Sequence, residues 1–188
     1  MFTETQKQAL LTIAREAIQG HLSGEVSIFG AAEPLPEASG VFVTIKRAGE
    51  LRGCLGTLEV LSALPEEVAR CARDSATRDP RFPPMTLAEL PHTRLEISVL
   101  GPLEPIDPPD PAAIELGVHG LVVEQGDRRG LLLPQVATEW GWTREEFLQR
   151  TCQKAGLPGD AWRRGAHVFR FSAEVFGEDG TEKVSDPR

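Results

Sequence analysis

The chain contains two segments of the same design, and this internal repeat constrains its fold more than any other feature. Each segment predicts a strand, a turn with glycine and an acidic residue, a second strand carrying Arg-Gly, and a helix with Glu-Glu near its start. Arg52 and Arg129 are 77 positions apart, and Cys71 and Cys152 are 81 apart. Such a period is too long for a solenoid and indicates duplication of one α/β unit.

Apolar residues alternate along three predicted strands, at Val41, Val43 and Ile45, at Leu95, Ile97 and Val99, and at Phe169, Phe171, Ala173 and Val175. Alternation of this kind turns one side of each strand toward a core. Short antiparallel hairpins combined with helices indicate an α+β fold. We expect a single domain over 1–188, with repeats at about 40–105 and 116–176 and a flexible tail at 177–188.

The chain carries 20 basic and 28 acidic residues, a formal net charge of -8. An acidic chain gains nothing from counterion release at a phosphate backbone, so we expect no general nucleic-acid binding. No segment approaches about 18 consecutive apolar residues, so we expect no membrane span. The N-terminal pattern is that of an amphipathic helix and not of a signal peptide, and Thr5 with Gln8 resembles a capping box.

The cysteines Cys54, Cys71 and Cys152 are far apart and form no CxxC pair. This predicts neither a disulfide framework nor a structural zinc site, and it favours a reducing cytoplasm. Cys71 and Cys152 recur with apolar residues at helical spacing, so we expect both in helix cores. The histidines are scattered, and no Walker A, GxGxxG or GxSxG motif occurs, so we expect no bound metal and no cofactor.

Cys54 has a different setting, because ELRGCLGT (50–57) places it between Gly53 and Gly56 and close to Arg52. One interpretation is a nucleophilic or ligand-contacting thiol, since glycines permit a bulge or a close approach and a guanidinium favours the thiolate. The other is a tightly packed strand in which glycine and cysteine fit beneath a helix. Spacing alone leaves both interpretations open.

Several stretches of the chain resemble, in order, the blocks of the AMMECR1 family: LRGCLGT, RDPRFPPMT, ELPHTRLEISVL, GVHG, LLLPQVATEWGW and FLQRTCQKAGL. They span about 40–165 of the sequence. The resemblance implies two related β-and-α repeats that form one barrel-like, largely antiparallel sheet with helices packed outside. It also implies association with a Memo-like protein and a radical-SAM enzyme, but it implies no particular reaction.

A candidate site lies within these blocks, around 52–56. Cys54 is the candidate nucleophile, and His119 in GVHG is the candidate base that takes the thiol proton. Arginines hold carboxylates or phosphates in bidentate fashion, which suggests a small acidic ligand. The candidate ligand-binding residues are Arg52, Gly53, Gly56, Arg81 and Glu124.

Simpler interpretations of these polar residues remain open. Asp79 and Arg81 would pair with each other or cap the preceding helix. His119 would hydrogen-bond the backbone at a turn, and Glu124 would be solvated on an exposed strand face.

A binding module is the competing class of function. The prolines of RFPPM predict a rigid loop, and Phe82 and Met85 are its candidate partner-binding residues if exposed. We expect first a partner or accessory role beside Memo-like and radical-SAM proteins. An enzyme or covalent carrier that depends on Cys54 is the alternative.

Overall fold

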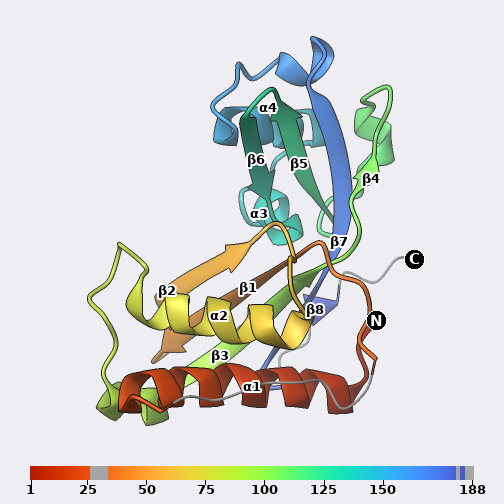
Figure 1. The fold of residues 1–188 in the computed structure, drawn as a ribbon. Helices are drawn as coiled ribbons and strands as arrows, with labels where there is room; N and C mark the ends of the chain where they lie inside the picture. Colours follow the sequence, from red (N-terminus) through yellow and green to blue (C-terminus); the bar gives the residue numbers. More distant parts are fainter. Residues whose placement is uncertain (26–33, 181–182, 185–188) are drawn as a thin grey trace. The chain divides into compact units, whose positions relative to one another are not determined.

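A computed structural model of the chain describes residues 1–25, 34–180 and 183–184 (Figure 1). These residues divide into two compact units, Met1–Leu100 with Glu174–Lys183, and Gly101–Ala173 with Val184–Arg188. Residues 40–100 of the first predicted repeat lie in the first unit, and its last residues, 101–105, lie in the second. Those of the second repeat lie in the second unit, except that the end of the last strand belongs to the first.

The first unit consists of α1 (Glu4–Ser23), β1 (Gly40–Arg47), β2 (Glu50–Thr57), α2 (Leu64–Thr77), the 3-10 helix η1 (Leu87–His92) and β3 (Thr93–Leu100). Its strands are ordered β2-β1-β3, followed by the end of β7 (His167–Gly177). β1 is antiparallel to both β2 and β3. β2 is therefore the edge strand of this unit.

The start of α1 is fixed by a capping box. The Gln6 amide donates to Thr3 Oγ1 at 3.2 Å, and the Thr3 amide donates to Gln6 Oε1 at 2.9 Å. This satisfies amides that the first helical turn leaves without partners. The predicted capping box at Thr5 and Gln8 is wrong, because both residues already lie inside the helix.

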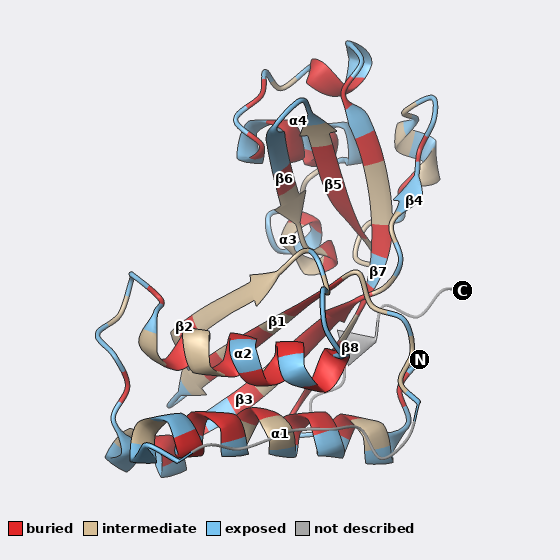
Figure 2. Ribbon diagram, in the orientation of Figure 1, coloured by how far each residue is buried: buried red, intermediate tan, exposed pale blue. Residues whose placement is uncertain are grey.

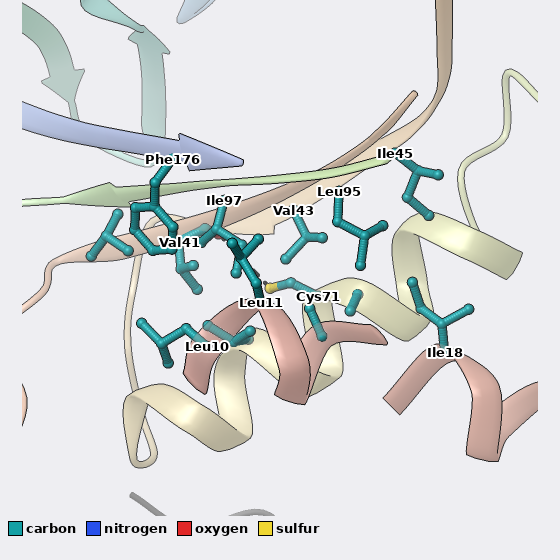
Figure 3. Close-up of a cluster of buried hydrophobic side chains, with 14 of the residues drawn as sticks. Leu10, Leu11, Ile18, Val41, Val43, Ile45, Cys71, Leu95, Ile97 and Phe176 are labelled. Atoms are coloured by element: carbon teal, nitrogen blue, oxygen red, sulfur yellow. Dashed lines mark hydrogen bonds between the residues drawn. The ribbon is translucent and has the colours of Figure 1, made fainter. Parts of the chain in front are cut away.

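Apolar faces of α1 and α2 pack with the sheet to form the first core (Figure 3). Figure 2 shows buried and exposed residues alternating along both helices, as expected for amphipathic helices. The core includes the predicted inward-facing residues of β1 and β3, and the buried thiol of Cys71 lies among them. The side chains labelled in Figure 3 are Leu10, Leu11, Ile18, Val41, Val43, Ile45, Cys71, Leu95, Ile97 and Phe176.

The second unit consists of β4 (Glu104–Pro105), the 3-10 helix η2 (Pro111–Ala113), β5 (His119–Gln125), β6 (Arg128–Leu132), α3 (Pro134–Glu139), α4 (Arg144–Lys154), the 3-10 helix η3 (Ala161–Arg163) and most of β7. Its strands are ordered β7-β5-β6, with β4 paired to β7, and β8 (Lys183–Val184) also pairs with β7. β5 is antiparallel to β6 and β7. Its core contains Phe147, Leu148 and Cys152 of α4.

These elements confirm the predicted α+β class with largely antiparallel strands. Along β7, Phe171, Ala173 and Val175 are buried as predicted, whereas Phe169 is only half-buried. No helix of the described residues is long and apolar enough to cross a membrane. The single domain over 1–188 stays a prediction, and 181–182 and 185–188 of the predicted tail lie outside the described residues.

Each unit has a hairpin on which a later helix packs closely, α2 in the first unit and α4 in the second, and a glycine permits this in each. A Cβ on Gly53 would lie 2.1 Å from the carbonyl oxygen of Ser75 in α2. A Cβ on Gly130 would lie 2.3 Å from the amide nitrogen of Ala155, at the end of α4. The Arg-Gly of each repeat therefore marks the point where helix backbone meets strand backbone.

We expect Gly53→Ala and Gly130→Ala each to lower the free energy of unfolding by about 2 kcal/mol, because backbone atoms must move apart. Urea denaturation of the variants measures this loss. Gly159→Ala is the matched control, since its Cβ would meet the flexible side chain of Gln149. Equal losses for all three variants would contradict the close-packing explanation.

Candidate functional site

Cys54 follows a β-bulge on the edge strand β2. Ile45 pairs with Gly53, and the next residue of β1, Lys46, pairs with Leu51, so Arg52 is an extra residue in β2. A bulge of this kind redirects the side chain of the extra residue. In the second unit Glu124 pairs directly with Arg129 in a regular register. The bulge therefore distinguishes Arg52 from its counterpart in the other repeat.

Asp79 and Arg81 hold the outer edge of β2 at Cys54. The Cys54 amide donates to Asp79 Oδ2 at 2.9 Å, and Arg81 Nη2 donates to the Cys54 carbonyl at 3.1 Å. The Arg81 guanidinium also donates to both oxygens of Asp79, at 2.9 and 2.7 Å. These two side chains give the edge peptide the donor and acceptor that a neighbouring strand would supply.

The Asp79 carboxylate is the anchor of this arrangement, since its side chain is only 2% exposed while that of Arg81 is 54% exposed. Hydrogen bonding from Arg81, with further donation from the amides of Cys54 and Arg81, holds the pKa of the Asp79 carboxyl far below its usual range despite burial. The predicted pairing of Asp79 with Arg81 is confirmed. It serves to join the loop to β2.

The glycines beside Cys54 are explained by packing. Gly53 faces the backbone of α2 at Ser75. A Cβ on Gly56 would lie 2.3 Å from the carbonyl of Val41 and 2.4 Å from the ring of Phe42, both on β1. Ser75 also accepts a hydrogen bond from the Leu55 amide at 2.8 Å. The interpretation of ELRGCLGT as a tightly packed strand beneath a helix accounts for both glycines.

Arg52 lies between a carboxylate and an aromatic ring. Its Nε donates to Glu89 Oε1 at 3.1 Å, and its Nη2 donates to the carbonyl of Pro83 at 3.0 Å. The guanidinium carbons of Arg52 and Arg81 lie 6.0 and 5.6 Å from the centre of the Phe82 ring, within cation–π range. Arg52 Nη1 is buried and has no hydrogen-bond partner among the described residues. Both arginines predicted to bind a ligand are thus paired with carboxylates of the chain itself.

The thiol of Cys54 differs from the other two in exposure and contacts. Thr44 Oγ1 on β1 donates to Cys54 Sγ at 3.2 Å, and Cys54 is half-buried. Cys71 and Cys152 are buried as predicted. Burial raises the pKa of the Cys71 thiol to about 11, and burial likewise raises the pKa of Cys152. Cys54 is therefore the most exposed of the three thiols.

His119 and Glu124 lie on β5 of the second unit, whereas Cys54 lies in the first. His119 Nδ1 accepts a hydrogen bond from the Glu115 amide at 3.0 Å, as the backbone interpretation predicted. Burial, followed by the charge of Arg170, lowers the pKa of the His119 imidazole. Glu124 lies 3.7 Å from Arg129 and its side chain is 37% exposed. The pairing of Cys54 with His119 stays a prediction.

A model of the AMMECR1 family matches residues 11–176, a range that contains Cys54, Asp79 and Arg81. The chain belongs to the AMMECR1 family.

Relatives of this AMMECR1-family chain match over nearly their whole length. A protein of Methanothermobacter thermautotrophicus is 48% identical over 92% of this chain and 94% of its own length. One from Thermofilum pendens is 45% identical over 90% of this chain and 88% of its own. The crystal structure of protein PH0010 from Pyrococcus horikoshii is similar with a TM-score of 0.80 and 43% identity, covering 95% of each chain. That structure has the same fold.

The expected exposure of Met85 in the AMMECR1-family loop is wrong. Met85 is 3% exposed and belongs to the first core, and its amide donates to the carbonyl of Ala76 at 2.8 Å. Its side chain is thus no part of a binding surface. Phe82 is half-buried between the two arginines, and Pro83 and Pro84 are exposed.

Three residues at the site of this AMMECR1-family chain were not predicted for it: Thr44, Ser75 and Glu89. Thr44 is opposite Cys54 in the β1–β2 register, so aligning the two predicted strands as a hairpin would have placed Thr44 beside the thiol. Ser75 stands on the apolar face of α2, where a polar residue indicates a hydrogen bond to the sheet. The sequence gives no comparable signal for Glu89. Glu89 is far from Arg52 along the chain, and the two residues meet only in the tertiary structure. Among the described residues, no group of three or more His, Cys, Asp or Glu is placed to hold a metal ion.

We expect Asp79→Asn to lower the free energy of unfolding by about 2 kcal/mol at pH 7, because charge-assisted hydrogen bonds are lost. The pKa of Asp79 is lowered on folding, so the ionised carboxylate stabilises the fold fully above its unfolded-state pKa of about 3.9 and progressively less as the pH falls toward its folded-state pKa. The difference between the wild type and the variant should therefore shrink below about pH 4. Urea denaturation from pH 7 to pH 3 measures it.

Asp179→Asn is the matched control, because Asp179 pairs with Arg94 while both side chains are more than half exposed. Exposed pairs contribute about 0–1 kcal/mol. A pH-independent difference for Asp79→Asn, or one no larger than that of the control, would contradict the role given to Asp79.

Proposed function

We propose that this AMMECR1-family chain is an accessory protein that binds a partner through the surface formed by Arg81, Phe82, Pro83 and Pro84. The observation that supports this is the placement of Phe82 between two guanidinium groups that are themselves fixed by carboxylates. Aromatic residues and arginine are enriched at protein interfaces, and rigid aromatic anchors contribute much of the binding energy.

The loop that carries this surface is held in place before any partner arrives. The Phe82 amide donates to the carbonyl of Asp79 at 3.1 Å, and Arg52 holds the carbonyl of Pro83. The amide of Met85, further along the same loop, is bonded to the end of α2. A loop with these attachments loses little conformational entropy on binding, which favours affinity.

The sequence blocks resemble those of a family associated with a Memo-like protein and a radical-SAM enzyme, and we propose these two as the partners. We place the complex in a reducing cytoplasm, where the free thiols of the chain stay reduced. In this proposal the chain positions or regulates its partners, and it carries out no bond chemistry itself.

We expect Phe82→Ala to weaken binding to the Memo-like or radical-SAM protein of the same organism by about tenfold, because the ring is the central anchor. Isothermal titration calorimetry with each purified partner measures the affinity. Trp140→Ala is the control, since Trp140 is also aromatic and is 71% exposed on the second unit. Binding that falls equally in both variants, or no binding by the wild type, would count against the proposal.

A Cys54-dependent enzyme or covalent carrier is the second candidate function. The observation that favours it is the half-buried thiol of Cys54, whose Sγ accepts a hydrogen bond from the hydroxyl of Thr44. Cys54 would then act on a small acidic ligand, with Arg52 or Arg81 exchanging an internal carboxylate for that ligand.

We expect iodoacetamide to label Cys54 in the native chain at pH 8, while Cys71 and Cys152 stay unlabelled because they are buried. Peptide mass spectrometry at a series of pH values measures the rate for each thiol. Reaction of Cys54 well below the reference thiol pKa of about 8.5 would support the second function. A rate as slow as that of Cys71 would exclude it, and Thr44→Val tests whether the hydroxyl is responsible.

A further inference from the structure

β6 is the edge strand of the second unit, because β5 pairs with it on one side and no strand of the described residues pairs with it on the other (Figure 1). The β5–β6 hairpin closes with the pair Gln125 and Arg128 around a two-residue turn, in which Gly126 has a φ of 63°. The pair that closes such a turn exchanges both of its backbone hydrogen bonds, and bonded and non-bonded pairs alternate from there. Arg129 and Leu131 therefore turn their amides and carbonyls away from β5, toward the open edge.

The first repeat shows what a covered edge looks like at the same position. Cys54 of β2 corresponds to Leu131, because each lies two residues after the arginine of the repeated Arg-Gly. The amide and carbonyl of Cys54 also point away from the neighbouring strand, and they bond to the side chains of Asp79 and Arg81. The edge of β2 is thus closed to an additional strand at this point.

The two covering side chains of the first repeat have no equivalent on β6. At a spacing of 81 residues, Asp79 corresponds to Asp160, whose side chain is 58% exposed and pairs with an arginine of its own loop. Arg81 corresponds to Trp162, a buried residue of the second core. Within the described part of the chain, no side chain hydrogen-bonds to the backbone of Leu131. Its outward amide and carbonyl can therefore pair with an added strand.

The open edge of β6 carries positive charge. Arg128 and Arg129 are both exposed, and the strand, RRGLL, has no acidic residue. Arg128 donates to the carbonyl of Gly156 at 2.8 Å, and the carboxylate of Glu124 lies 3.7 Å from Arg129, beyond hydrogen-bond distance. Asp127 of the turn forms no ion pair with either arginine among the described residues. An added segment therefore meets two guanidinium groups that can bind its carboxylates.

We propose that the open edge of β6 binds an extended, acidic segment of a partner protein as an additional antiparallel strand. The outward groups of Arg129 and Leu131 identify an extended backbone as the occupant, and the two arginines identify an acidic one. The site goes beyond the proposed function, since it uses none of the residues of the Arg81–Pro84 surface.

A second copy of this chain is the wrong occupant of the edge. A Cβ on Gly130 would lie 2.3 Å from the amide nitrogen of Ala155, so the end of α4 lies directly on β6. Paired strands are about 4.8 Å apart, whereas packed helices need about 8–10 Å. Two β6 strands paired about Gly130 would bring the two α4 ends into collision, which a segment without a helix avoids.

The probe is the fluorescein-labelled peptide Ser-Thr-Val-Thr-Glu-Glu, titrated with the full chain and followed by fluorescence anisotropy. In the antiparallel register its valine lies opposite Leu131 and its glutamates opposite Arg129 and Arg128. N-methylation of the valine removes an amide that bonds to β6 and should weaken binding at least about tenfold. N-methylation of the second threonine, whose amide points away from β6, should leave binding unchanged. Equal losses for the two peptides, or no binding of the probe, would overturn the proposal.

Two variants locate the site. Leu131→Pro removes the outward amide and should weaken probe binding by about tenfold, and an edge strand accepts proline where its amide faces solvent. Arg128→Glu changes only an exposed side chain. It should weaken probe binding by about fivefold and tighten the binding of a peptide with lysine in place of both glutamates, a reversal that a loss of structure would not produce.

Unchanged binding of both peptides by Arg128→Glu would overturn the proposal, and so would an equal loss for both. A wild-type dimer, seen by sedimentation velocity, that Leu131→Pro abolishes would also overturn it, since the occupant would then be a second copy.

Discussion

The hydrogen bond from the Cys54 amide to the Asp79 carboxylate joins the loop after α2 to the edge of β2, and much of the candidate site depends on it. Without the Asp79 carboxylate the edge strand would present the unpaired Cys54 amide to solvent, and Arg81 would lose its bidentate partner. The same carboxylate orients Arg81 beside Phe82. One buried charge thus determines both the protection of the strand and the shape of the neighbouring surface.

The two repeats share one packing feature, a glycine beneath a helix, but differ in the side chains around their hairpins. Gly53 and Gly130 both permit a helix to lie directly on a hairpin. Only the first hairpin has the bulge in which Arg52 is the extra residue. Only in the first repeat is the aspartate of the loop after the helix, Asp79, buried against the edge strand. In the second repeat the corresponding Asp160 is exposed and pairs with Arg164. The bulge at Arg52 and the buried Asp79 are therefore features of the first repeat that the second repeat lacks.

Much of the fold was determined by the sequence alone, because periodicity and the repeat reflect burial directly. The spacing of Cys71 and Cys152 placed both in helix cores, and alternation placed Val41, Val43 and Ile45 inside. Family membership also followed from contiguous blocks. Only the tertiary structure decided that Asp79 bonds to Cys54, that Glu89 holds Arg52, and that Met85 is buried. These contacts join loops to distant elements, and a loop has no periodicity from which a partner can be inferred.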